Sequence, residues 1–296
     1  MQLLRGHTKG IASLAVSPDS RFVAASGLAQ CHVWDLSDTK PKPRTLPPAG
    51  KAYCLGFSSL ATLDALVGEK WWRYDLAAGT QIQVAFPMKL RRAGAILHPS
   101  GQLLKAFSPD RARQLLTVRV SGGGVKVVGG GVPVPIDLIS FDPSGVRYLA
   151  EHIYTHVESV FDLRDTVTDQ VVTTFELSND FQEVDFYVFT RDGDKLFAIT
   201  GNDVAIYPCP KGGPPILEFT AATARQFNAL AVHPGGRVLA TVEDQRTVTL
   251  RDADTLQPLR SYDFAMPKVT CVAFTPDGTR CVVGNSRGKV LLFDVE

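Results

Sequence analysis

Two short stretches of the sequence carry side chains that could act as metal ligands or as a nucleophile. CHVWDLSD (31–38) sets Cys31 beside His32, and both residue types are common zinc ligands. GNSRG (284–288) has the G-x-S-x-G spacing of a hydrolase nucleophile elbow, in which a serine attacks an acyl group. A metal needs both ligands on one face, and an elbow needs a strand followed by a helix. The elements that position these residues therefore decide their chemistry.

Two further stretches suggest metal or phosphate binding. EHIYTHVE (151–158) holds His152 and His156, which would share one face of a helix as a metal site. If the segment instead spans a hairpin tip, the two histidines could still meet across strands, or they are solvated loop residues. GGGVKVVGGG (122–131) has the glycines of a phosphate-binding loop, but no helical pattern follows it. For this stretch we expect turn, strand and turn.

Seven copies of one pattern occupy almost the whole chain. LAVSPDSRFVAASG (14–27) returns as VAFTPDGTRCVVGN (272–285), with five weaker copies between them. Each copy has an alternating apolar run, a turn and a second alternating run, which predicts a β-hairpin. The turns follow one another at steps of 41, 40, 44, 48, 43 and 42 residues, and they centre on Pro18, Ser59, Pro99, Pro143, Arg191, Pro234 and Pro276.

A second motif follows each turn after 15–19 residues, and it is an aromatic residue with an acid or a remnant of that pair. The pair is intact at Trp34-Asp35, Tyr74-Asp75, Phe161-Asp162 and Phe293-Asp294. With Gly6-His7 ahead of the first unit, the sequence resembles the WD40-repeat family, whose units run from Gly-His to Trp-Asp. The resemblance implies an all-β fold, a seven-bladed β-propeller of four-stranded antiparallel blades.

The family often builds a hydrogen-bonded tetrad from a His, a strand Ser or Thr, a turn Asp and the Trp. Only His7 and Trp34 occupy matching positions in this chain, and SGLAQC (26–31) lacks the turn Asp. The resemblance therefore implies the propeller without implying a complete tetrad.

The repeat also predicts how the ring closes. The last unit ends at LLFDVE, three strands into its blade, while QLLRG (2–6) is an apolar strand without a blade of its own. We expect residues 2–6 to be the outer strand of the seventh blade, because closure removes exposed sheet edges. The chain is then one domain, 1–296, with no further domain expected, and its approximate units are 7–47, 48–87, 88–131, 132–177, 178–221, 222–265 and 266–296 plus 2–6.

A β-propeller assigns structural roles to the first two stretches. Successive side chains of a strand point to opposite faces, so one metal could not easily take both Cys31 and His32. GNSRG would join two strands, and no histidine follows Ser286 to complete a triad. We therefore expect a blade strand and a hairpin turn, and the sequence predicts no catalytic, metal-binding or cofactor-binding residues.

Composition limits the partners and the compartment. The formal net charge is +1, so the molecule as a whole offers no strong field for nucleic acid or an anionic membrane. Little aromatic character is interleaved with the basic residues, which makes nucleic acid an unfavoured partner. The N-terminus has no apolar export signal and no run approaches 18 apolar residues. Five scattered cysteines without CxxC predict free thiols and a cytoplasmic protein.

The expected binding surface is the face at which the innermost strands begin, because seven loops converge there. Eight or nine positions before each turn, five of the seven residues are basic, and Pro135 and Glu183 are the exceptions. Solvated loops are the alternative. The hypothesis is a non-catalytic scaffold that binds another protein or peptide, acidic or phosphorylated, through Lys9, Lys51, Arg91, Arg92, Arg225 and Lys268.

Two alternatives stay open at this point. A propeller enzyme of the lactonase or quinoprotein type would need acids or histidines at one channel mouth, and the candidates are Asp137, Glu183 and Asp185. Charge is also uneven around the ring. Residues 88–131 carry eight Lys or Arg against one acid, and residues 132–177 carry eight acids against two Arg. This contrast indicates either ion pairs between neighbouring blades or a partner surface of mixed sign.

Overall fold

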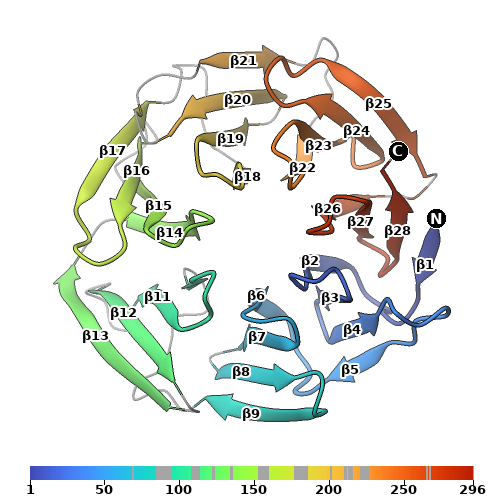
Figure 1. Cartoon of the computed structure of the whole chain (residues 1–296), viewed down its shortest axis with the longest axis horizontal. Coiled ribbons are helices and arrows are strands. Elements are labelled where there is room, and N and C mark those ends of the chain that lie inside the picture. Colours follow the sequence, from blue (N-terminus) through green and yellow to red (C-terminus); the bar gives the residue numbers. More distant parts are fainter. Residues whose placement is uncertain are drawn as a thin grey trace.

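The fold is a closed ring of seven antiparallel sheets, as the repeat predicts (Figure 1). It was obtained as a computed structural model, which describes residues 1–295 except 69, 85–94, 108–113, 122–123, 134–135, 153–159, 177–185, 201, 210–211, 213–215, 221–226, 265 and 267. The described residues form 28 β-strands. No segment among them is a helix with the length and hydrophobicity that a membrane crossing requires. The predicted all-β, seven-bladed propeller is confirmed.

Six blades consist of four consecutive strands, of which the first lies at the channel and the last at the rim (Figure 1). Blades 1 to 3 are β2 (Ile11–Val16), β3 (Phe22–Gly27), β4 (Cys31–Asp35) and β5 (Arg44–Leu46); β6 (Ala52–Phe57), β7 (Thr62–Val67), β8 (Lys70–Asp75) and β9 (Thr80–Val84); and β10 (Ile96–Leu97), β11 (Leu103–Phe107), β12 (Gln114–Ser121) and β13 (Gly124–Pro133). Blades 4 to 6 are β14 (Ile136–Phe141), β15 (Arg147–His152), β16 (Val160–Asp165) and β17 (Val171–Glu176); β18 (Phe186–Phe189), β19 (Lys195–Thr200), β20 (Asp203–Pro208) and β21 (Leu217–Thr220); and β22 (Phe227–Val232), β23 (Val238–Glu243), β24 (Thr247–Asp252) and β25 (Pro258–Asp263).

The seventh blade joins the two ends of the chain. It consists of β26 (Val269–Phe274), β27 (Arg280–Asn285), β28 (Val290–Asp294) and, as its outer strand, β1 (Gln2–Leu4). In the antiparallel pairing of β1 with β28, Leu4 stands opposite Val290. Leu4 is 1% exposed and packs in a cluster with Trp34 and Val290, whereas Leu3 is 39% exposed. The predicted closure by the N-terminal strand is confirmed.

The turns after three of the inner strands share one hydrogen-bonding pattern. In three blades, a hydroxyl at the end of the inner strand donates to the turn aspartate at 2.5–2.6 Å, namely Ser17 to Asp19, Thr190 to Asp192 and Thr275 to Asp277. The main-chain amide of Gly278 closes the same turn onto the carbonyl of Thr275, with φ at +75°. Glycine adopts this left-handed conformation without strain, which explains the Pro-Asp-Gly pattern.

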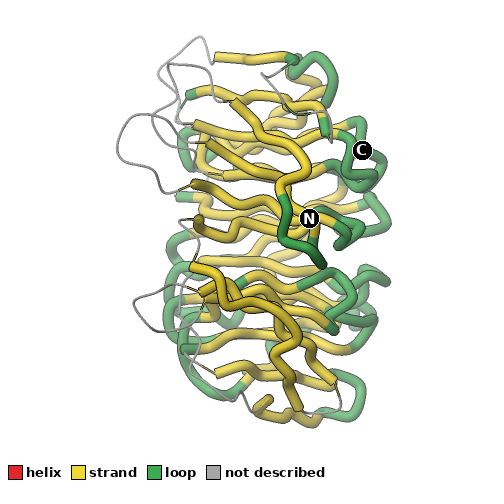
Figure 2. The backbone as a smooth tube through the Cα atoms, turned by 90° about the vertical axis from the view of Figure 1, so that its left-hand side faces the viewer, coloured by secondary structure: helices red, strands yellow, loops and turns green. Residues whose placement is uncertain are grey.

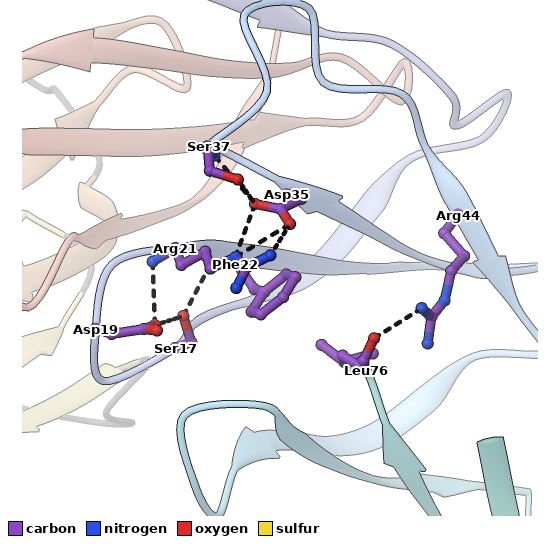
Figure 3. A network of polar contacts seen from close by, with 8 residues as sticks. All are labelled: Ser17, Asp19, Arg21, Phe22, Asp35, Ser37, Arg44 and Leu76. Carbon is purple, nitrogen blue, oxygen red and sulfur yellow. Dashed lines mark hydrogen bonds and ion pairs between the residues drawn. The ribbon is translucent and has the colours of Figure 1, made fainter. Parts of the chain in front are cut away.

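In the first blade, an ion pair connects the start of β3 to the end of β4 (Figure 3). Arg21 donates from Nε and Nη2 to the carboxylate of Asp35 at 2.7–3.1 Å, and Ser37 donates to the same carboxylate. The bond from Arg21 is the main cause that lowers the pKa of Asp35 to about 2. Arg44 reaches the next blade, where its Nη1 donates to the carbonyl of Leu76 at 3.0 Å (Figure 3).

The residues that match the family's tetrad bind main-chain carbonyls instead. Trp34 donates from Nε1 to the carbonyl of Arg5 at 3.0 Å, and Nε2 of His7 bonds the carbonyl of Ala25 at 3.1 Å. The ring of His7 meets that of His32 edge to face, with centroids 4.3 Å apart. The pKa of His7 is lowered to about 4, mainly because the ring is withdrawn from water and to a smaller extent because His32 is close. This buried group therefore secures the segment that links β1 to β2.

The charge contrast between the third and fourth units is explained in part by an ion pair between blades. Lys105 of β11 is fully buried, and its ammonium donates to Asp169 of the fourth blade and, at 2.9 Å, to Thr117. The hydroxyl of Tyr148 donates to the same carboxylate at 2.9 Å. A buried ammonium needs such partners, because leaving it unpaired costs several kcal/mol, in the range of about 3–5.

All five cysteines are free, as expected. Cys31, Cys209 and Cys281 are buried, and Cys54 and Cys271 are half-buried. Burial raises the pKa of the Cys54 thiol to about 11 and that of Cys271 to about 12. A thiol with a raised pKa stays protonated near neutral pH and is a poor nucleophile.

The ring closure predicts a contrast between two adjacent leucines. Leu4→Ala should lower the free energy of unfolding by about 2–5 kcal/mol, because it leaves a cavity between the first and last blades. Leu3→Ala should cost less than about 1 kcal/mol, since Leu3 faces solvent. Urea denaturation of both variants measures the difference, and equal losses would mean that β1 does not close the core.

The pair of half-buried His7 and buried His32 predicts a loss of stability in mild acid. The unfolded chain protonates His7 near the ordinary pKa of 6.5, whereas the folded chain does so only near 4. The unfolded state therefore binds more protons between these values, and the free energy of unfolding falls as the pH falls. The melting midpoint should drop between about pH 7 and about pH 5. His7→Phe should reduce this drop, and an unchanged drop would contradict the assignment.

Candidate functional site

The face at which the inner strands begin is called the mouth face here. Lys9, Lys51 and Lys268 lie on it, immediately before β2, β6 and β26 respectively. The turns between the second and third strands of the first, sixth and seventh blades lie on the same face, because neighbouring strands are antiparallel (Figure 2). Arg91, Arg92 and Arg225, the other three basic residues of the expected ring, lie outside the described residues. The structure thus places half of the expected basic set on one face.

Lys51 precedes the inner strand β6 and contacts the aromatic ring of Tyr53, a residue that lines the central cavity. Its ammonium lies 5.3 Å from the centroid of the Tyr53 ring, and Tyr53 is 43% exposed. The inner strands of the first five blades surround a cavity of about 550 Å³, lined among others by Tyr53, Leu55, Phe57, Ile139, Phe141 and Tyr187. Lys51 and Tyr53 can therefore offer a charge and an aromatic surface together.

Two basic residues that the repeat analysis did not select join Lys9 and Lys268. Arg287 and Lys289 lie in the turn between β27 and β28, and both are exposed. The side-chain oxygen of Asn285 accepts hydrogen bonds from the main-chain amides of Arg287 and Lys289 at 3.0 and 2.8 Å. This Asx-type arrangement fixes the turn and holds both cations on the mouth face.

Main-chain contacts bring the segments of this basic cluster together. The amide of Ser286 donates to the carbonyl of Lys268 at 2.9 Å. Gly288 has φ of +80°, and a Cβ at this position would lie 2.8 Å from the carbonyl oxygens of His7 and Lys9. Only glycine permits both the conformation and the close approach. Lys9, Lys268, Arg287 and Lys289 therefore come from three segments that meet at one turn, and we call these four residues the basic cluster.

The cations of the basic cluster have no partner within the described part of the chain. None of the four side chains forms an ion pair or hydrogen bond there, and all are exposed. Two exposed arginines elsewhere do have carboxylate partners, as Arg21 has in Asp35 and Arg246 has in Asp263, whereas Arg119 and Lys126 have none among the described residues. The field of the basic cluster is thus directed to solvent, where an anionic ligand could meet it.

The stretches that could have held a metal ion, a nucleophile or a phosphate lie in the strands and turns of the blades. Cys31 packs toward the second blade with Val33, while the His32 ring lies 6.0 Å from that of Trp34 on the other face, as expected for a strand. GNSRG forms the turn between β27 and β28, so the predicted hairpin is confirmed and no helix follows it. In GGGVKVVGGG the second glycine run lies inside β13 rather than in a turn, and the pairing steps from Val118–Val127 to Thr117–Gly129, which leaves an extra residue in β13.

The acidic and histidine candidates fall largely outside the described residues. His156, Glu183 and Asp185 are among the residues that are not described, whereas Asp137 belongs to β14 and His152 ends β15. The described ranges contain no group of three His, Cys, Asp or Glu residues that could hold a metal ion.

Comparisons with known proteins agree with this architecture. The family model for the WD domain, G-beta repeat, matches residues 1–35 and 257–294, which are the first unit and the end of the chain. The fold is similar to the crystal structure of the β-propeller domain of Cps50 (Swd1) from Myceliophteria thermophila, with a TM-score of 0.80 over 100% of both chains at 15% identity. No curated protein matches the sequence. The chain is a seven-bladed β-propeller whose two ends match the family model of the WD domain, G-beta repeat.

Proposed function

We propose that this propeller is a non-catalytic scaffold that binds an acidic or phosphorylated segment of another protein on its mouth face. The observation that carries the proposal is the basic cluster, whose exposed cations have no carboxylate partner in the described ranges. Converging like charges repel one another, so they do not stabilise the free protein. A bound carboxylate or phosphate would relieve that repulsion through charge-assisted hydrogen bonds.

The neighbouring residues extend the same surface toward the channel. Lys51 and Tyr53 lie at the mouth on the second blade, next to the first blade that carries Lys9. An acidic segment held by the basic cluster could place an apolar or aromatic side chain over Tyr53. Arg91, Arg92 and Arg225 belong to the proposal as further contacts, on the strength of their position in the repeat.

A binding role also fits the chemistry of the groups that depart from their ordinary pKa. Burial raises the pKa of the Cys54 and Cys271 thiols and lowers that of His7, so these groups are uncharged near neutral pH. The exposed residues of the proposed site are instead lysine, arginine and tyrosine, whose side chains can bind a partner but do not make an acid–base or nucleophilic site. The five free thiols support a reducing compartment, and we place the protein in the cytoplasm.

An oligoglutamate peptide with a fluorescent label tests the proposal by fluorescence anisotropy. We expect binding at low salt, and no binding of an oligolysine peptide of equal length. The affinity should fall when salt rises from about 0.01 M to about 0.15 M, because the screening length shortens from roughly 30 Å to about 8 Å. A triple variant, Lys9→Glu, Lys268→Glu and Arg287→Glu, should lose at least about tenfold in affinity.

The matched control is a double variant, Lys40→Glu and Lys42→Glu, in the loop between β4 and β5 on the opposite face. It reverses exposed lysines without touching the basic cluster and should bind the peptide like the unmodified protein. Equal affinities of the triple variant and the unmodified protein, or an affinity that salt does not change, would refute the proposal.

A further inference from the structure

The face opposite the mouth face contains a groove between the third and fourth blades. Its volume is about 470 Å³. One wall comes from the third blade, with Leu103 and Arg119, and the other from two turns of the fourth blade, with Val146 and Val167. None of the basic cluster lines it, so the groove is separate from the site proposed above.

The fourth-blade wall is apolar and exposed. Val167 is 87% exposed and Val146 is 60% exposed, and they project from the turns that follow β16 and β14. Leu103, which is half-buried, packs at the interface between the two blades with Phe141 and Tyr148. Two exposed valines beside a concave surface can bury one apolar side chain of a partner.

The third-blade wall carries two positive charges that have no ion pair within the described part of the chain. In the sheet register Leu103 stands opposite Arg119, and Arg119 stands opposite Lys126, so the three side chains share the face that looks toward the fourth blade. Arg119 and Lys126 are exposed, and neither has an ion pair or hydrogen bond with a described residue. Like charges directly opposite each other on a sheet are unfavourable. An anion bound to both would offset that repulsion.

Asp165 and His98, two other polar residues of the groove, already form hydrogen bonds within the protein. Oδ1 of Asp165 accepts hydrogen bonds from the amides of Val167 and Thr168 at 3.0 and 2.7 Å. These bonds, that of Thr168 first, lower the pKa of Asp165. The imidazole of His98 bonds Ser100 and the carbonyl of Gly145. The groove is therefore positive along the third blade and negative at the Asp165 end of the other wall.

We propose that this groove binds an extended segment of a second protein in which an apolar side chain is flanked by a carboxylate. The apolar side chain lies over Leu103 between Val146 and Val167, and the carboxylate pairs with Arg119 and Lys126. Asp165 repels a carboxylate at the other end and so fixes the direction of the segment. The protein then holds two partners at once, one on each face of the ring.

Selection from a random peptide library displayed on phage, against the immobilised full chain, tests the proposal. We expect the enriched peptides to contain an aliphatic or aromatic residue next to Asp or Glu. Failure to enrich any peptide, or enrichment of peptides without this pair, would overturn the proposal.

Variants of the groove show where an enriched peptide binds, with anisotropy of the synthetic labelled peptide as the readout. Arg119→Glu and Val167→Asp should each weaken binding at least about tenfold. Replacement of the peptide's acidic residue by Lys should restore binding to the Arg119→Glu variant. The controls are Lys40→Glu and Leu60→Asp, which alter an exposed lysine and a 57%-exposed leucine on the same face but outside the groove.

The outcomes separate this site from the mouth face. The triple variant of the basic cluster should bind the enriched peptide with unchanged affinity. Loss of binding in that triple variant with retention in Arg119→Glu and Val167→Asp would overturn the groove proposal and leave the mouth-face proposal standing. All variants should keep the melting midpoint of the unmodified protein, because every substituted side chain is exposed.

Discussion

The antiparallel pairing of β1 with β28 is the interaction on which the rest of the ring depends. Three residues at the start of the chain complete the last blade and bury Leu4 against the first one. Without this strand, β28 would present an unpaired edge, which is a template for aggregation. The same closure also positions the mouth face. The segment from Arg5 to Gly10 crosses between the two blades, so Lys9 meets the turn of Arg287 only in the closed ring.

On the opposite face, hydrogen bonds between the turns of neighbouring blades link the blades to one another. The amide of Asp277 donates to Oγ of Ser20 across the closure, and His98 and His233 each bond a glycine carbonyl of the following blade. In a repeat architecture, stability is the sum of such nearest-neighbour terms. On this face Val146 and Val167 of the fourth blade are exposed, and both line the groove. The two faces thus offer different chemistry, a cluster of cations on one and a polarised apolar groove on the other.

The sequence predicted those structural elements that short stretches of neighbouring residues determine. Alternating runs and Pro-Asp-Gly turns predicted the hairpins, and the unmatched QLLRG segment predicted the outer strand of the seventh blade. Contacts across blades could not be predicted from the repeat. The pairing of Lys105 with Asp169 joins residues 64 positions apart, and it follows from blade packing rather than from spacing. Arg287 lies near Lys9 because Gly288 lets the β27–β28 turn approach the segment before β2 closely. The repeat pattern of the sequence contains no sign of this contact. The second glycine run departs from the predicted turn, because Gly129 and Gly130 pair with Thr117 and Leu116 of β12 and so belong to the sheet.

The most direct test of the proposed function is zero-length carbodiimide cross-linking of an oligoglutamate peptide to the full chain, read out by mass spectrometry. This chemistry joins a carboxylate only to an amine in contact with it, so it reports the face on which the peptide sits. Binding at the mouth face predicts cross-links at Lys9, Lys268 and Lys289, with Lys51 as the next site. Cross-links confined to Lys40, Lys42 and Lys195, which lie at the opposite face, would contradict it.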